Sequence, residues 1–382
     1  MWAIRVVIGP WFDYLPHGGG IGQGIVESAA DALLMIAMWR RTESVCFALA
    51  GTVLIATAAY DVALSAIVWT TVVASAFGKI AVASILLGWH RAGWLHVAII
   101  SGIAWSAVHI YTGAVFVTLG VFMALLLEPM LQRDWQSLRR HAAVMVAVVF
   151  ALQVPYVMHQ LRTGFRAAAM GAVTGGVWSI VSGRQPAELA KSVNGFLGAV
   201  NFIQVSPWTI ALTPWLPLAA AIAVAVRYRR DPSAVTLLLA PQVAAIVGYA
   251  LFLGPLDHYY YIPVVPLVVA TMTLAVAIPS RFRVGQAVGI EALIATAALV
   301  PSRLRFAATM HRMPQYGMLV HAMKEIAHRS EPMRAIREDF ALPRTCEPVF
   351  LYTILGGRID PAARWEAVIS ADGHVTYHRA DE

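Results

Sequence analysis

Three carboxylates near the start of the chain have the chemistry of a general base. Asp13 lies in the glycine-rich stretch GPWFDYLPHGGGIGQG, and Glu27 and Asp31 follow in IVESAADALLMIAMW. Residues four apart share one face of a helix, and a positioned carboxylate takes a proton from a reacting hydroxyl. The alternative for Glu27 and Asp31 is a solvated helix start, where the helix dipole also favours negative charge. No strand precedes the glycines and no lysine follows them, which excludes Walker and Rossmann phosphate sites and favours a flexible loop.

Histidine and tyrosine side chains adjoin apolar segments at two further places. His109 and Tyr111 lie in SAVHIYTG, and LDHYYYIPVVPLVV contains His258 and Tyr259–Tyr261. Aromatic residues at such boundaries are commonly interfacial anchors. The row of phenols beside an imidazole also provides hydrogen-bond donors and a stacking surface for a phosphate or a sugar ring.

The composition requires a membrane to position these groups. Of the 382 residues, 59% are hydrophobic and only 13% charged, whereas soluble domains are about 25% charged. Charged residues are much denser after residue 301, which predicts a membrane-embedded body, 1–301, and a small polar domain, 302–382. Ten apolar segments divide the body: 24–39, 45–60, 63–88, 95–108, 110–127, 142–157, 209–226, 233–253, 261–279 and 284–300.

Basic residues predict the orientation of the body. Five short loops carry arginines: 40–41, 91, 133–140, 227–230 and 281–283. Placing them in the cytoplasm puts both termini, the loop 158–208 and His258 outside, so the outer face is the expected working face. The basic excess, a net charge of +7, is then a membrane-topology signal rather than a sign of nucleic-acid binding. Met1–Gly24 contains no segment long enough to carry the N-terminus outside. Either this start inserts as a hairpin with segment 45–60, or a helix lies upstream of Met1, and we favour the upstream helix.

The last 81 residues predict a small α+β domain. Tyr316–Ser330 has a helical apolar repeat, Pro348–Leu355 has the composition of a strand, and Glu366–Arg379 has the pattern of a hairpin that turns at Asp372–Gly373. The histidines of this region have no metal-binding spacing. No pattern in the chain indicates a metal or another cofactor, and Cys46 and Cys346 form no recognisable disulfide framework.

The body resembles the GT-C-fold glycosyltransferases of the bacterial mannosyltransferase or aminoarabinose-transferase type. Three features carry the resemblance: VPYVMHQLRTGF (Val154–Phe165), DHYYYIPVVPLVV, and the tail after the last apolar segment. It implies a polytopic all-α body of about ten helices in a bacterial inner membrane. Proteins of this type transfer a sugar from a polyprenyl-phosphate carrier to a lipid, glycan or protein outside the cytoplasm.

The resemblance also implies roles for the polar residues. A carboxylate of the first outer loop is the base, for which Asp13 is the first candidate and Glu27 and Asp31 the next. Histidine and tyrosine side chains hold the phosphate leaving group: His109, Tyr111, His258, Tyr259, Tyr260 and Tyr261. The partners are then membrane lipid and the lipid-linked donor. The alternatives are a small-molecule or flippase-like carrier and a catalytically silent protein of the same fold.

Overall fold

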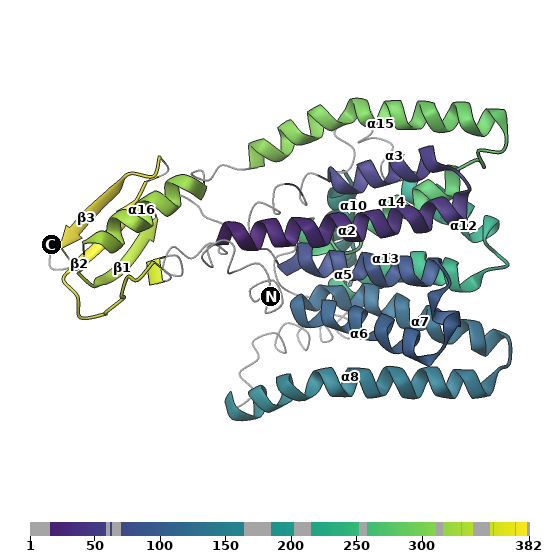
Figure 1. The fold of residues 1–382 in the computed structure, drawn as a ribbon, viewed down its shortest axis with the longest axis horizontal. Coiled ribbons are helices and arrows are strands. Elements are labelled where there is room, and N and C mark those ends of the chain that lie inside the picture. Colours follow the sequence, from purple (N-terminus) through teal and green to yellow (C-terminus); the bar gives the residue numbers. More distant parts are fainter. Residues whose placement is uncertain are drawn as a thin grey trace. The chain divides into compact units, whose positions relative to one another are not determined.

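The computed structural model describes residues 16–58, 62, 70–163, 185–201, 215–251, 258–310, 316–329, 331–338, 352–353, 355–370 and 372–379. The described chain divides into two compact units (Figure 1). A helical body comprises Gly24–Val62 and Thr70–Phe306, and the C-terminal domain belongs to the other unit, which takes in Ala307–Glu382.

Each of the ten apolar segments corresponds to one apolar helix of the body. Five of these helices are long and apolar enough to cross a membrane: α2 (Pro16–Thr42), α7 (Val115–Leu131), α8 (Trp135–Thr163), α13 (Pro232–Ala250) and α15 (Arg283–Met310). Five are shorter: α3 (Val45–Ala56), α5 (Thr70–Leu86), α6 (Trp94–Ile110), α12 (Trp215–Arg227) and α14 (Val265–Val276). The chain is therefore an α-rich membrane protein.

The first helix begins earlier than the sequence predicts. The glycine-rich stretch expected as a flexible loop is helical from Pro16 onward. Glycine weakens a helix by up to about 1 kcal/mol per residue but does not forbid one. As a result Glu27 and Asp31 lie in the interior of α2 rather than in its first two turns.

Close backbone approach joins α7 to α13 at the centre of the body. A Cβ atom on Gly120 of α7 would lie 2.4 Å from Cγ of Pro241, inside α13. Only glycine allows this contact, because Pro241 occupies the space a side chain would need. Thr118 of α7 also donates a hydrogen bond of 2.7 Å to the carbonyl of Ala104 on α6. These contacts fix the neighbours of α5, which packs against α6, α7 and α13.

Two long helices of the body are mostly exposed. Only 6% of the apolar window of α8 and 17% of that of α15 is buried, and the two helices lie at opposite edges of the body (Figure 1).

Arg303 joins α15 to α3: its fully buried guanidinium donates to Thr57 Oγ1 (2.8 Å) and Leu54 O (2.7 Å). This cation satisfies a carbonyl in the last turn of α3, where the helix dipole favours positive charge.

The segment 158–208, which we expected to be one long loop, contains helical structure. Helix α8 continues to Thr163, and α10 (Gln185–Asn201) packs against α13. The buried residues among those described on this helix are Ser192, Gly195, Phe196, Ala199 and Val200. Their spacing repeats at three to four residues, the pattern of an amphipathic helix. That pattern was present in the sequence, and polar residues between the apolar ones obscured it.

In the residues that the structure describes, the C-terminal domain has a three-stranded sheet and the helix α16. Helix α16 (Tyr316–His328) confirms the predicted helix, and β2 (Trp365–Ile369) pairs antiparallel with β3 (Val375–Arg379), which confirms the hairpin. Gly373 has a φ of +82° at the turn, a conformation that glycine adopts without strain. The sheet order is β1-β2-β3, and β1 (Met333–Glu338) runs parallel to β2. Apolar residues of α16, among them Met323 and Ile326, pack in one core with residues of the sheet.

One predicted strand of this domain is wrong where it can be checked. Tyr352 and Thr353, within the predicted strand Pro348–Leu355, are helical. Tyr352 is buried in the core of the domain and its hydroxyl contacts the carbonyls of Glu331 and Arg358. At Tyr352 the apolar residue therefore reflects burial and not extended structure, an ambiguity that short apolar segments commonly have.

Candidate functional site

Three charged side chains meet in the interior of the helical body. Lys79 of α5 forms ion pairs with Glu27 and Asp31 of α2, and the distance from Lys79 Nζ to Asp31 Oδ1 is 2.5 Å. The residues are 3%, 9% and 6% exposed, in that order. We call Glu27, Asp31 and Lys79 the buried triad. The expectation of a solvated helix start at Glu27 and Asp31 is thus wrong, because both carboxylates lie within α2 and face α5.

The triad lies well inside the candidate membrane span of α2. Arg41, near the end of this helix, donates through Nε to the carbonyl of Leu86, the last residue of α5. At 1.5 Å of rise per residue, Asp31 and Lys79 lie about 15 and 10 Å from this level. Charged groups at such depth are costly and usually mark a functional pathway or a paired structural site.

Helix α5 presents further buried polar groups on the face that carries Lys79. Thr71 and Ser75 precede Lys79 by eight and four residues, which places the three on one side of the helix. Both hydroxyls are buried and have no hydrogen-bond partner among the described residues. Oε2 of Glu27 is likewise buried and has no hydrogen-bond partner among the described residues. Buried polar atoms without a partner are rare in folded proteins and call for an explanation.

A second cluster gathers tyrosines at one end of the body, which we call the tyrosine end. Tyr249 of α13 lies at its centre: its hydroxyl donates to the carbonyl of Tyr260 (3.0 Å) and lies 3.3 Å from the hydroxyl of Tyr111. Its ring contacts those of Tyr260 and Tyr261 edge-on, at 5.8 and 4.9 Å between centroids. The cluster brings together residues that the sequence predicted at two separate places, around a tyrosine that it did not single out.

Tyr261 has a packing position in this cluster. It lies in η4 (His258–Tyr261), is fully buried, and donates from its hydroxyl to the carbonyl of Ser192 (2.8 Å). The hydroxyl of Ser192 in turn donates to the carbonyl of Ile246 (2.7 Å), so this pair joins α10, α13 and η4. Tyr111 and Tyr260 are only partly buried.

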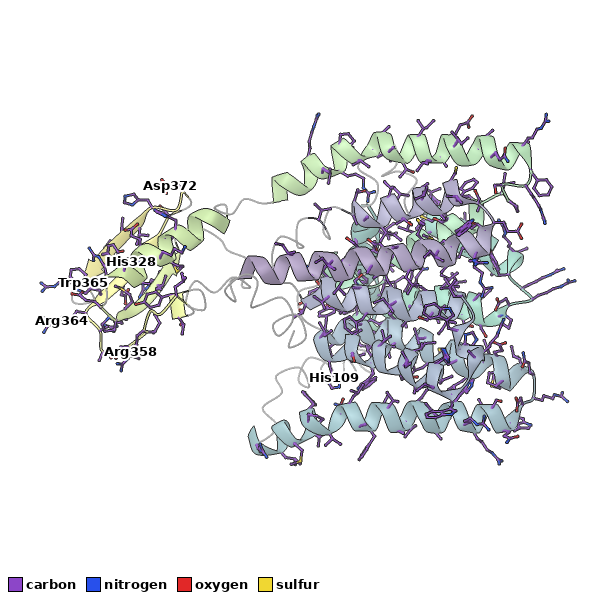
Figure 2. The ribbon with its side chains drawn as sticks, in the orientation of Figure 1. His109, His328, Arg358, Arg364, Trp365 and Asp372 are labelled. Atoms are coloured by element: carbon purple, nitrogen blue, oxygen red, sulfur yellow. The ribbon has the colours of Figure 1, made fainter. Side chains whose placement is uncertain are left out.

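His109 lies in the last turn of α6, two residues before Tyr111 (Figure 2). It is exposed, and its ring contacts Trp105 and Tyr156 of α8 edge-on, at 6.2 and 6.3 Å. Asp13 lies outside the described residues, as does Asp257. Of His258 and Tyr259 the structure describes the backbone of η4 and not the side chains.

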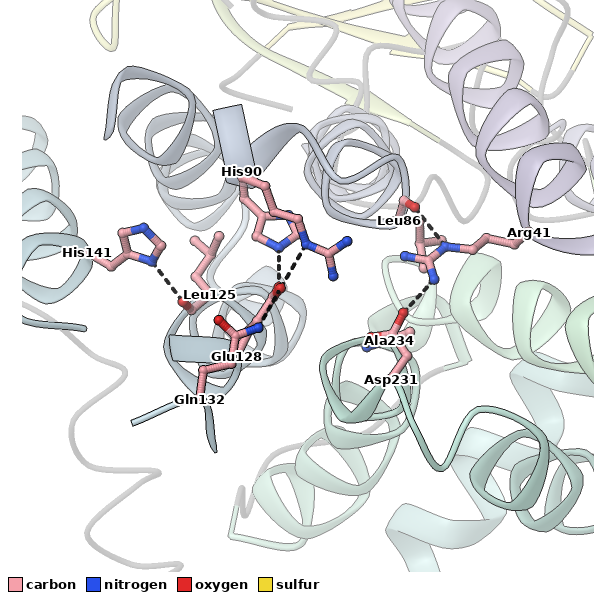
Figure 3. Close-up of polar contacts among 10 residues, drawn as sticks. Arg41, Leu86, His90, Leu125, Glu128, Gln132, His141, Asp231 and Ala234 are labelled. Atoms are coloured by element: carbon pink, nitrogen blue, oxygen red, sulfur yellow. Dashed lines mark hydrogen bonds and ion pairs between the residues drawn. The ribbon is translucent and has the colours of Figure 1, made fainter. Parts of the chain in front are cut away.

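Polar contacts hold the opposite end of the body together; we call it the arginine end (Figure 3). Arg41 Nη1 lies 2.5 Å from Asp231 Oδ2, and Asp231 Oδ1 also accepts from the backbone N–H of Ala234 as the N-cap of α13. Partial burial by itself would raise the pKa of Asp231. The hydrogen bonds from Arg41 and Ala234 outweigh this effect and hold the pKa below its ordinary value.

Glu128 of α7 gathers two basic residues at this end. His90 Nε2 and Arg91 Nε, both in η2 (Trp89–Ala92), lie 2.8 Å from its two carboxylate oxygens. Burial lowers the pKa of His90, and the hydrogen bond to Glu128 only partly offsets this. The neutral imidazole therefore donates Nε2–H to Glu128, and the contact is a hydrogen bond rather than an ion pair.

Comparison of the chain with known proteins identifies no relative that could assign a function to these residues. No family model, curated protein or solved structure matches the chain. Within the described residues, no group of three or more His, Cys, Asp or Glu side chains is placed to hold a metal ion. The function must therefore be inferred from the tyrosine end and the buried triad themselves.

Proposed function

We propose that the protein is a membrane glycosyltransferase that takes a sugar from a polyprenyl-phosphate carrier. The observation that supports this proposal is the convergence of Tyr111 and Tyr260 around Tyr249 at one end of the body, where His109 ends the neighbouring helix α6. Imidazole and phenol donors at the end of apolar helices suit a phosphate that is attached to a membrane lipid. A lipid phosphate is a good leaving group, so base activation of the acceptor and stabilisation of the anion suffice for transfer.

The proposal assigns different roles to the residues of the site. His109, Tyr111 and Tyr260, with His258 and Tyr259, bind the donor phosphate, and Tyr261 supports them by packing. Asp13 is the preferred base that accepts the proton of the acceptor hydroxyl. Glu27 and Asp31 are weaker candidates for this step because Lys79 already binds both carboxylates.

The topology belongs to the same proposal. The ten apolar helices are taken as ten spans of a GT-C-like body in a bacterial inner membrane. The arginine end then faces the cytoplasm, because basic loops stay on that side, and the tyrosine end, the C-terminal domain and both termini lie outside. Donor and acceptor meet at the outer face.

Two histidines on one helix provide a matched test of donor binding. His109 and His96 are both exposed and lie near opposite ends of α6. His109→Ala and His258→Ala should each weaken binding of a polyprenyl phosphate to the purified protein by about 5- to 150-fold, the loss of one charge-assisted hydrogen bond. His96→Ala should leave the affinity unchanged. Equal affinity in all four proteins would overturn the assignment of the tyrosine end.

A transfer assay tests the catalytic step separately. Asp13→Asn should reduce sugar transfer from the lipid-linked donor by about 10²- to 10⁴-fold, the usual contribution of a positioned base, and should leave donor binding intact. A parent protein that binds the donor but transfers no sugar would support a catalytically silent member of the same fold. Undiminished transfer by Asp13→Asn would move the base to Glu27 or Asp31.

The buried triad favours one alternative function, a small-molecule or flippase-like carrier. Carriers place charged and polar groups near the middle of the membrane, where substrate and coupling ions bind. Lys79, Glu27 and Asp31 meet this description, and the tyrosine end does not require them. Two assays distinguish these functions. Sugar transfer by the protein in detergent supports the enzyme, whereas lipid or solute movement across liposomes that contain the protein, without sugar transfer, supports the carrier.

A further inference from the structure

The buried triad has an unbalanced charge. Glu27 and Asp31 together carry two negative charges when ionised, and Lys79 carries one positive charge, so the three side chains leave one negative charge in the interior of the body. An unneutralised charge in a medium of low polarity is strongly unfavourable, and proteins relieve it by pairing or by a change of protonation.

A second observation identifies where the excess charge resides. Oε1 of Glu27 contacts Lys79, whereas Oε2 is buried without a hydrogen-bond partner among the described residues. Glu27 as a whole is 9% exposed. An ionised carboxylate oxygen is the group that most needs a donor when it is removed from water. This oxygen is therefore the atom of the triad at which a proton would bind.

Among the described residues, the other titratable groups on the elements that pack against α5 lie near the ends of those elements. Helix α5 packs against α6, α7, α13, η2 and η3 (Thr112–Ala114). The titratable residues that the structure describes on these elements lie at the two ends of the body, as does Tyr111 between α6 and η3. They are His90, Arg91, His96, His109, Glu128 and Tyr249. Among the described residues, the charges that act on Glu27 are those of Lys79 and Asp31.

We propose that the buried triad is a proton-binding site, with Glu27 Oε2 as the atom that binds the proton. Uptake forms an O–H bond on Glu27 with a proton from water, and the three side chains then have no net charge. Ser75 and Thr71 mark the route from the N-terminal end of α5, since their buried hydroxyls lie one and two helical turns from Lys79. The site is independent of whether the protein transfers or carries its substrate.

Infrared difference spectroscopy tests the site because a protonated carboxylic acid has a carbonyl band that a carboxylate lacks. Spectra of the purified protein in liposomes, titrated from neutral to alkaline pH, should contain one such band at neutral pH that disappears on alkalinisation. Glu27→Gln should remove this band. Asp31→Asn should remove it too, because Glu27 and Lys79 then balance each other. Lys79→Met leaves two carboxylates without a cation and should give a band about twice as large.

The control is a carboxylate at the end of the same helix that is open to water. Glu43 follows α2 and pairs with Arg281 at 3.7 Å, with 58% of its side chain exposed. Glu43→Gln should leave the band unchanged. The proposal is overturned if the parent has no acid band at neutral pH, or if Glu27→Gln and Asp31→Asn retain it. Circular dichroism and size-exclusion profiles that match the parent identify the variants that fold, and the two isosteric amide variants decide the outcome if Lys79→Met does not.

Discussion

Substitution of Tyr261 by phenylalanine isolates one buried hydroxyl at the tyrosine end. The ring keeps its edge-on contacts with Tyr249 and Phe196, at 4.9 and 5.9 Å between centroids. The change removes the hydrogen bond of 2.8 Å to the carbonyl of Ser192 and the contact of 2.7 Å with the hydroxyl of Ser192. Nothing else that the structure describes for this side chain is lost.

The expected cost follows from a count of protons. The Ser192 hydroxyl donates its one proton to the carbonyl of Ile246, and the Tyr261 hydroxyl donates its one proton to Ser192 O. Both protons are thus directed at carbonyls, so Tyr261→Phe removes one hydrogen bond and leaves the bond from Ser192 to Ile246 in place. At about 0.5–1.5 kcal/mol for each net hydrogen bond, the free energy of unfolding should fall by about 0.5–1.5 kcal/mol.

Equilibrium unfolding in mixed detergent micelles measures this loss. Tyr156→Phe is the matched control, since Tyr156 is 45% exposed on α8, and its effect should stay within about 0.5 kcal/mol. Ser192→Ala combined with Tyr261→Phe should cost less than the sum of the single changes, because both remove the same contact. Polyprenyl-phosphate affinity should be unchanged in Tyr261→Phe. Parent-like stability together with a loss of donor affinity would refute the packing role.

Three further predictions concern the arginine end and the topology. Asp231→Asn keeps an acceptor for the N-cap of α13 but loses the ion pair with Arg41, whereas Asp231→Ala loses both; the second variant should be less stable by about 1 kcal/mol in the same unfolding assay, and equal stabilities would refute the cap. Because the pKa of His90 is lowered in the folded protein, the contribution of His90 to stability is present above the ordinary value of about 6.5 and is lost as the pH falls through the folded-state pKa. His90→Gln should therefore flatten the pH dependence of the free energy of unfolding in this range. An unchanged slope would assign the pH dependence to other groups. A membrane-impermeant thiol reagent should label Cys346 in intact cells if the C-terminal domain is outside; labelling only after permeabilisation would reverse the orientation.

The apolar helices could be predicted from the sequence because their signal is local. Each of the ten segments depends on a run of apolar residues that a window of the sequence contains. Helix ends were less certain: α2 begins at Pro16 through a glycine-rich stretch, and α15 continues to Met310, beyond the expected end at residue 300. The hairpin β2–β3 was predictable for the same reason, since its turn at Gly373 is part of its own sequence.

Contacts between distant segments could not be predicted in this way. Tyr249 was overlooked because nothing in GYALF distinguishes it from an ordinary aromatic residue of a membrane helix. Its importance comes from Tyr111, which is 138 positions away, and from Tyr260. Ser192 has no local signal either, because polar residues on both sides of it give the segment of α10 the composition of a loop. The parallel strand β1 likewise depends on pairing with β2 across a long connection, which local patterns do not report.

The buried triad shows what additional information the sequence would have needed. The spacing of Glu27 and Asp31 predicts that both carboxylates lie on one helix face. Lys79 lies within the apolar segment 63–88, where a charge has either to snorkel or to find a partner. These two facts match in charge, yet 48 and 52 positions separate Lys79 from the two carboxylates. The missing element was the register of α2 against α5, which the contact of Arg41 with Leu86 reveals at the end of both helices. With that register, the carboxylates and the lysine come to a similar depth, and the excess negative charge becomes a property of one site rather than of two unrelated segments.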